Sequence, residues 1–155
     1  MSDHKITFTY LSQEDLLEAG CFDIHMAMEV AEKTMLAFKD NRILFPEKIV
    51  QIFDQASQDR INCLPATLLD EKVSGVKWVS VFPGNPALHG AQNLSAIFVL
   101  SEIEKGFPTA VMEGTLASNM RVAAMGGVAA KHLSRMDSEV IGFIGAGEQA
   151  KMHLL

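Results

Sequence analysis

Apolar residues in the first forty positions follow the spacing of one short strand and two helices. Residues 6–10 alternate between apolar and polar, as a strand with one buried face does. Ser12 is expected to cap a two-turn helix that stops at Gly20, and Asp23 is expected to cap a longer helix that runs to about Lys39. Along that longer helix, the apolar residues that recur at helical spacing and predict a buried face are Ala27, Ala31, Met35 and Phe38.

The middle of the chain predicts a series of strands separated by polar turns. The expected strands are residues 48–53, 60–64, 75–82, 95–100 and 108–112. Pro65 is expected to end the second of these strands, and residues 83–90, which are rich in Pro, Gly and Asn, are expected to form a loop. Strands joined by short turns usually pair antiparallel. The first part of the chain therefore predicts an α+β fold with a mostly antiparallel sheet.

A long helix is expected from about Leu116 to Ser134, with Thr115 as its cap. Small residues dominate this helix, and Gly126 and Gly127 lie inside it, where each glycine costs about 0.5–1 kcal/mol relative to alanine. So many small residues indicate close approach by a neighbouring backbone or by a cofactor. Because the helix ends just before the last apolar segment, we expect it to cross between two domains.

That last apolar segment, Val140 to Ile144, predicts a buried parallel strand that opens into glycines. Gly145, Gly147 and Ala150 occupy the small-residue positions of the dinucleotide motif G-x-G-x-x-G/A. The first position allows a tight turn, the second lets the backbone approach a pyrophosphate, and the third lets the next helix lie close to the strand. We expect that helix to run on through the last residues and to direct its N-terminal N–H groups at the anion.

The dinucleotide motif also predicts a second strand and an acidic residue about 20 positions further on. Only five residues follow Ala150. Either the chain is the N-terminal portion of a longer protein, or the glycines serve another purpose. We expect the first of these.

Composition narrows the class of protein. The net charge of −6 argues against nucleic acid or an anionic membrane as a partner, and no run approaches the ~18 apolar residues of a membrane span. Cys21 and Cys63 are too few for a disulfide framework, and the polar N-terminus shows no signal peptide, so we expect a cytoplasmic protein. The histidines and cysteines show no metal-ligand spacing, so no metal is expected.

Three basic residues could carry chemistry. Lys77 shares one face of its expected strand with Val79 and Val81, so it either binds a substrate carboxylate or transfers a proton there, or it extends from the strand end to water. Arg121 lies among small residues in the long helix, where it either binds a carboxylate or phosphate or is exposed. Lys48 is a weaker candidate for an anion contact.

Together these segments resemble the ornithine cyclodeaminase/mu-crystallin family. The resemblance lies in residues 114–124, with Thr115, Ser118 and Arg121, in residues 129–133, and in residues 140–150, which end in Gly-Ala-Gly-Glu-Gln-Ala. Gly75-Val-Lys-Trp78, followed by a loop with Pro, Gly and Asn, resembles the strand of that family that carries a substrate lysine.

The resemblance implies an α+β substrate-binding and dimerisation domain over residues 1–114, a connecting helix over 115–136, and the first β-turn-α of a Rossmann-like α/β domain over 137–155. It implies NAD or NADP as cofactor, a small amino acid or imine as substrate, and a homodimer. The pyrophosphate turn is then formed by Gly145, Ala146, Gly147, Glu148 and Gln149.

By the same resemblance, Lys77 is the catalytic lysine and contacts the substrate carboxylate, and Arg121 lies near both the carboxylate and the cofactor. Lys48 stands where many members have a substrate-binding arginine. Ser118 and Val122 replace two threonines of the family motif, and the family's acidic catalytic residue would lie beyond Leu155. The implied activity is that of an NAD(P)-dependent oxidoreductase or cyclodeaminase acting on an amino acid or its imine. The alternative is a non-catalytic, mu-crystallin-like ligand-binding or dimerisation protein.

Overall fold

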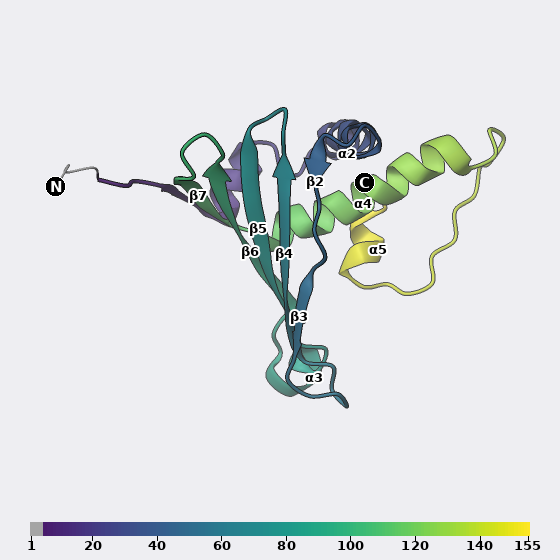
Figure 1. Ribbon diagram of the computed structural model, residues 1–155. Coiled ribbons are helices and arrows are strands. Elements are labelled where there is room, and N and C mark those ends of the chain that lie inside the picture. Colours follow the sequence, from purple (N-terminus) through teal and green to yellow (C-terminus); the bar gives the residue numbers. More distant parts are fainter. Residues whose placement is uncertain (1–4) are drawn as a thin grey trace.

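The computed structural model describes residues 5–155. The expected lack of a signal peptide concerns residues 1–4 as well, and these lie outside the described residues. Its strands are β1 (Thr9–Leu11), β2 (Ile43–Leu44), β3 (Ile49–Ile52), β4 (Arg60–Leu68), β5 (Val73–Val81), β6 (Leu94–Glu102) and β7 (Pro108–Glu113). Its helices are α1 (Gln13–Glu18), α2 (Ile24–Lys39), α3 (Asn85–His89), α4 (Thr115–Leu133) and α5 (Glu148–Met152). The helices α2, α4 and α5 lie together beside the sheet (Figure 1).

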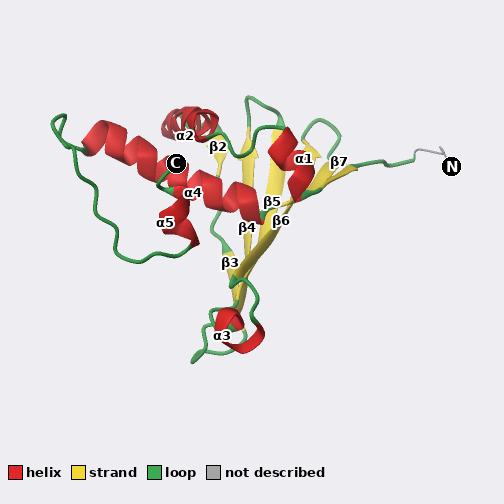
Figure 2. Ribbon diagram, turned by 180° about the vertical axis from the view of Figure 1, so that it is seen from behind, coloured by secondary structure: helices red, strands yellow, loops and turns green. Residues whose placement is uncertain are grey.

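Within the described residues the strands form one sheet in the order β1-β7-β6-β5-β4-β2, and β3 also pairs with β4. All of the pairs are antiparallel except β1 with β7, which is parallel. The mostly antiparallel sheet expected from the sequence is therefore present, and α1, α2, α4 and α5 lie on one side of it, whereas α3 lies at its end (Figure 2).

Two expectations, one about the end of a strand and one about a loop, were wrong. β4 continues through Pro65 to Leu68 instead of ending at the proline. On the side away from β5, β3 pairs with β4 only up to Cys63 and β2 pairs only from Thr67, so the missing N–H of Pro65 breaks no ladder on that side. The segment 83–90, expected to be loop, contains the short helix α3.

The first two helices begin at the residues that the sequence indicated. Ser12 and Asp15 form a reciprocal capping box at the start of α1, and the Asp23 carboxylate accepts hydrogen bonds from the first N–H groups of α2. The predicted apolar stripe of α2 was only half right. Ala27 and Ala31 are half-buried, whereas two members of the stripe extend into solvent and are about half exposed, namely Met35 and Phe38.

The start of α4 differs from the expectation that Thr115 caps it. The N-cap is Gly114, and the Glu113 carboxylate accepts hydrogen bonds from the backbone N–H groups of Thr115 and Leu116. The Thr115 hydroxyl instead accepts a hydrogen bond from the Ala96 N–H at 3.1 Å. Since a carboxylate at a helix N-terminus is favoured by the helix dipole, this arrangement fixes α4 to strands β6 and β7.

α4 is the best-buried helix of the chain, and its small residues explain how closely it is packed. The buried positions of α4 are Leu116, Ser118, Met120, Ala123, Ala124 and Val128. A Cβ on Gly126 would lie 2.6 Å from the His153 ring of the α5 end, and a Cβ on Gly127 would lie 2.9 Å from the Met28 sulfur of α2. Close approach was predicted correctly, but the neighbours are side chains of two flanking helices.

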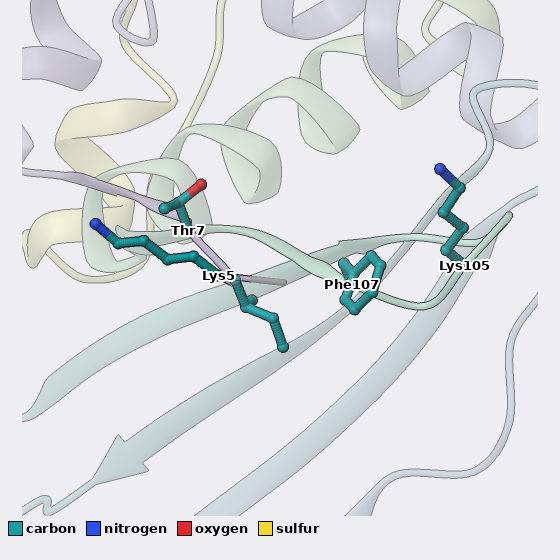
Figure 3. A pocket seen from close by; sticks show the side chains of 5 residues that line it. Lys5, Thr7, Lys105 and Phe107 are labelled. Carbon is teal, nitrogen blue, oxygen red and sulfur yellow. The ribbon is translucent and has the colours of Figure 1, made fainter. Parts of the chain in front are cut away.

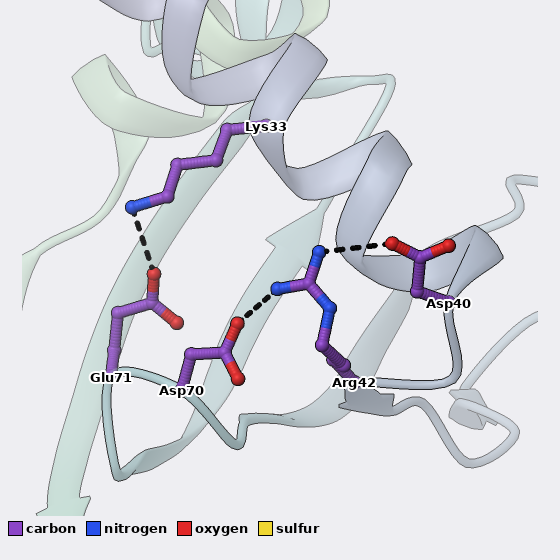
Figure 4. A network of polar contacts seen from close by, with 5 residues as sticks. All are labelled: Lys33, Asp40, Arg42, Asp70 and Glu71. Carbon is purple, nitrogen blue, oxygen red and sulfur yellow. Dashed lines mark hydrogen bonds and ion pairs between the residues drawn. The ribbon is translucent and has the colours of Figure 1, made fainter.

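Two ion-pair groups fasten α2 to the hairpin between β4 and β5 (Figure 4). The Arg42 guanidinium pairs with Asp70 and, at 3.2 Å, with Asp40 at the end of α2, and these hydrogen bonds raise the pKa of Arg42 above its ordinary value. Lys33 of α2 pairs with Glu71 at 3.2 Å. These groups are exposed, so they contribute orientation more than stability.

The segment from Val140 to Ile144 was expected to be a strand and is irregular instead. It has no neighbouring strand among residues 5–155, and a lone strand would leave its backbone groups unpaired. Its apolar side chains are open to solvent, with Val140 91% and Ile141 69% exposed. The helix after the glycines also ends early, at Met152.

We predict that Gly126→Ala changes the free energy of unfolding in opposite directions with and without the His153 side chain. In the wild-type background the new methyl group would collide with the imidazole ring, so Gly126→Ala should lower the free energy of unfolding. In a His153→Ala background the collision is absent, and the same change should raise the free energy of unfolding by about 0.5–1 kcal/mol through helix propensity. Urea denaturation of the wild type, the two single variants Gly126→Ala and His153→Ala, and the double variant tests this. Equal stabilisation in both backgrounds would show that His153 does not pack on α4.

Candidate functional site

Lys77 lies at the middle of β5, on the sheet face that α4 covers. By strand alternation it shares that face with Val79, which is buried. Its direct cross-strand neighbours are Leu64 on β4 and Phe98 on β6, both apolar. A lysine surrounded in this way needs a polar partner, because a buried ammonium without one is strongly unfavourable.

That partner comes from α4. The Lys77 Nζ donates a hydrogen bond to the Ser118 hydroxyl at 3.3 Å, and Ser118 is 3% exposed. Arg121, one helical turn further along α4, is exposed, yet its charge acts on the same amine. Burial first, and then the Arg121 charge, lower the pKa of Lys77 below its ordinary value. An amine of this kind gives up its proton more readily than a surface lysine does.

The structure therefore brings Lys77 and Arg121 to one place, as the sequence suggested. It does not bring Lys48 into that group by any hydrogen bond or ion pair among the described residues, because Lys48 lies exposed just before β3. Sequence analysis named Ser118 as a residue of the family motif but did not place it against Lys77, and it missed Asn62 of β4 on the same covered face. Only the register of β4 and β5 and the docking of α4 reveal them.

The segment 145–150 leads into α5, which lies against α4 (Figure 1). Gly145 has a φ of +98°, a conformation that favours glycine, and no atom lies within 4 Å of where a Cβ on Gly145 or Gly147 would be. Gly147 caps α5 without any side-chain hydrogen bond, and the acidic residue of the first turn, Glu148, pairs with Lys151 at 3.1 Å.

The side-chain amide of Gln149 donates a hydrogen bond from Nε2 to the side-chain Oδ1 of Asn119 on α4 at 2.8 Å. This bond links the turn of residues 145–150 to the helix that holds Ser118.

Two surface hollows of the molecule lie away from Lys77 and Arg121. One of about 550 Å³ is bordered by Lys5, Ile6, Thr7, Lys105 and Phe107, at the edge of the sheet near the N-terminal segment (Figure 3). Neither it nor the adjoining hollow around Glu71 and Glu102 is lined by Lys77 or Arg121. Within residues 5–155 we find no group of three or more His, Cys, Asp or Glu side chains placed to hold a metal ion. No helix in this part of the chain combines the length and apolarity needed to cross a membrane.

Comparison with known proteins identifies relatives over almost the whole chain. The model of the ornithine cyclodeaminase/mu-crystallin family matches residues 16–155. Alanine dehydrogenase of Archaeoglobus fulgidus is 35% identical over 144 residues, which are 93% of this chain and 42% of that protein.

Two solved structures share the fold. An archaeal alanine dehydrogenase dimer with bound NAD is 34% identical, with a TM-score of 0.85 over 95% of this chain and 43% of that one. The Δ1-pyrroline-2-carboxylate reductase of Thermococcus litoralis, in complex with NADH and L-proline, is 32% identical, with a TM-score of 0.86 over 94% of this chain and 44% of that one. The chain thus spans less than half the length of the relatives it matches.

We predict that replacing Lys77 with methionine stabilises the protein at neutral pH. Because the folded state lowers the pKa of Lys77, the charged amine destabilises the fold below that pKa. This penalty disappears as the pH rises towards the unfolded value of about 10.4, where both states release the proton. The Lys77→Met protein should therefore have the higher melting temperature at pH 7, and its advantage should shrink in alkaline solution.

Melting temperatures measured between pH 7 and pH 10.5 test this. Lys105→Met, at an exposed turn residue, is the matched control and should bring no comparable gain at pH 7. An advantage of Lys77→Met that stays constant over the whole range would show that the amine is not penalised in the fold.

Proposed function

The chain belongs to the ornithine cyclodeaminase/mu-crystallin family, and on that premise we propose that the protein is an NAD(P)-dependent oxidoreductase acting on a small amino acid or its imine. The relatives that support this include an alanine dehydrogenase and a Δ1-pyrroline-2-carboxylate reductase. Both names describe carbon–nitrogen redox chemistry next to a carboxylate. A cyclodeaminase activity would use the same chemistry in both directions.

The observation that carries the proposal is the pairing of Lys77 with Ser118 under the charge of Arg121. Two cationic groups near one another on a largely apolar face need an anion to balance them. A substrate carboxylate meets that need, since Arg121 can hold it with two parallel hydrogen bonds and Lys77 as a point charge. Its lowered pKa also suits Lys77 to pass a proton to or from the substrate nitrogen.

The cofactor would be NAD or NADP, held by Gly145, Ala146, Gly147, Glu148 and Gln149. The open space around Gly145 and Gly147 and the uncapped start of α5 fit the close approach of a pyrophosphate. When bound, the nicotinamide would accept or return a hydride at the α-carbon of the substrate. The contribution of this chain is to hold the carboxylate with Lys77 and Arg121 so that the α-carbon faces the ring.

Within this proposal residues 1–114 form the substrate-binding and dimerisation domain, residues 115–136 the connecting helix, and residues 137–155 the start of a Rossmann-like domain. Large apolar side chains are exposed on β1, β3 and α2, and the unpaired segment 140–144 is exposed as well. Exposed apolar surfaces of this kind favour contact with another polypeptide. We propose that the surface formed by β1, β3 and α2 is the interface of a homodimer. The two free thiols, Cys21 and Cys63, suit the cytoplasm.

We predict that Lys77→Ala in the full-length protein removes most of the turnover and leaves the affinity for NADH nearly unchanged. Losing both a carboxylate contact and the proton-transfer group should lower kcat/KM by about 10²–10⁴-fold. The test is NAD(P)H formation with L-alanine or L-proline, together with NADH binding followed by fluorescence.

Lys72→Ala is the control, because Lys72 lies in an exposed turn and pairs with Glu104 at 2.7 Å. Turnover that survives Lys77→Ala would remove Lys77 from the site. Wild-type protein that binds NADH but turns over no amino acid or imine would instead favour the non-catalytic, mu-crystallin-like alternative.

A further inference from the structure

Asn62 of β4 has an unsatisfied polar atom on the same face of the sheet as Lys77. Its Oδ1 is shielded from solvent and has no hydrogen-bond partner in the described part of the chain. In the strand register, Asn62 lies opposite Val50 on β3 and Val79 on β5, neither of which offers a side-chain donor. A buried acceptor left without a donor destabilises the fold, so its presence calls for an explanation.

Three side-chain donors share this face near Asn62, namely Lys77, Arg60 on β4 and Lys48 just before β3. Arg60 already donates to the Gln58 carbonyl oxygen at 2.8 Å, and Lys48 is exposed, so Lys77 is the donor that remains on the covered part of the face.

Leu64 is directly opposite Lys77, and Asn62 is two residues from Leu64, so Asn62 and Lys77 are diagonal neighbours on one face. Diagonal pairs lie about 7–8 Å apart along the backbone, within reach of a long side chain. The Lys77 ammonium has three N–H donors, and Ser118 accepts one of them in a bond of 3.3 Å.

We propose that Asn62 is a positioning residue for Lys77: its Oδ1 is the second acceptor of the Lys77 ammonium. This rests on the proposed function for its catalytic consequence. Ser118 on α4 and Asn62 on β4 then hold the amine from two sides, and the third N–H is left for the substrate carboxylate. The pair converts a flexible lysine into a group with a fixed direction, as positioning the α-carbon requires.

The charged surroundings of Lys77 are simple, which makes the idea testable by titration. On α4 the charged neighbour is Arg121, and the Glu113 carboxylate is engaged by the N–H groups at the start of that helix. On β6 the residue opposite Lys77 is Phe98. On β4 the charged residue of this face is Arg60, which lies two residues from Asn62 and opposite Val81.

The experiment measures the titration of Lys77 itself, by competitive acetylation with acetic anhydride and mass spectrometry across pH, in the full-length protein. Asn62→Leu removes the acceptor and should lower the Lys77 midpoint by about one pH unit, the size of a hydrogen bond to a charged group. Asn62→Asp keeps an acceptor, adds a negative charge and should raise the midpoint by about 1–3 units. Thr67→Asp adds the same charge on the opposite face of β4 and should leave the midpoint unchanged.

An unchanged Lys77 midpoint in Asn62→Leu would overturn the proposal, and melting curves would establish that the variant is folded. If Asn62→Leu does not fold, Asn62→Asp tests the proposal in its place. A Lys77 midpoint that moves no further in Asn62→Asp than in Thr67→Asp would also overturn the proposal. This readout does not depend on turnover. With L-alanine or L-proline, Asn62→Leu should lower kcat about tenfold or more without changing NADH affinity, and Asn62→Asp should restore part of it. Shifted titration without any effect on turnover would contradict the positioning role, although the pairing of Asn62 with Lys77 would stand. Absence of turnover in the wild-type protein would instead contradict the proposed function.

Discussion

The partial burial of one lysine beneath one helix is the constraint on which the rest of the structure depends. Lys77 is surrounded on its sheet face by apolar neighbours, and α4 supplies the Ser118 hydroxyl that makes this position tolerable. For Ser118 to reach the amine, α4 must lie close to β5 and β6. Gly114, whose Cβ would come within 3.0 Å of the Ala96 backbone, permits that approach.

α4 also connects the other parts of the molecule. Gly127 lets the Met28 side chain of α2 pack against it, and Gly126 does the same for His153 at the end of α5. Through Asn119 it is hydrogen-bonded to Gln149, beside the glycines of the dinucleotide motif. One helix therefore determines where the lysine, the arginine and the glycine-rich turn stand relative to one another. A small displacement of α4 would disturb all three, as close-packed interiors transmit strain.

Family membership and the geometry around Lys77 support the same proposed function. The comparisons identify the family over residues 16–155, and the relatives are more than twice as long as this chain. The geometry adds what similarity alone does not supply, namely an amine with a lowered pKa next to a guanidinium and a nearby acceptor without a partner. These features give the proposed enzyme a physical basis in residues of this chain.

Local signals in the sequence determined the starts of the first two helices, the run of antiparallel strands and the two basic residues of the site. Ser12 and Asp23 cap their helices because capping involves only neighbouring residues. Tertiary structure decided the rest, since pairing and burial depend on distant partners. It carried β4 through Pro65 and left residues 140–144 without a neighbouring strand, because a strand forms only where another segment lies next to it. It also placed Asn62 on the sheet face that carries Lys77, since the register of two strands decides which side chains share a face.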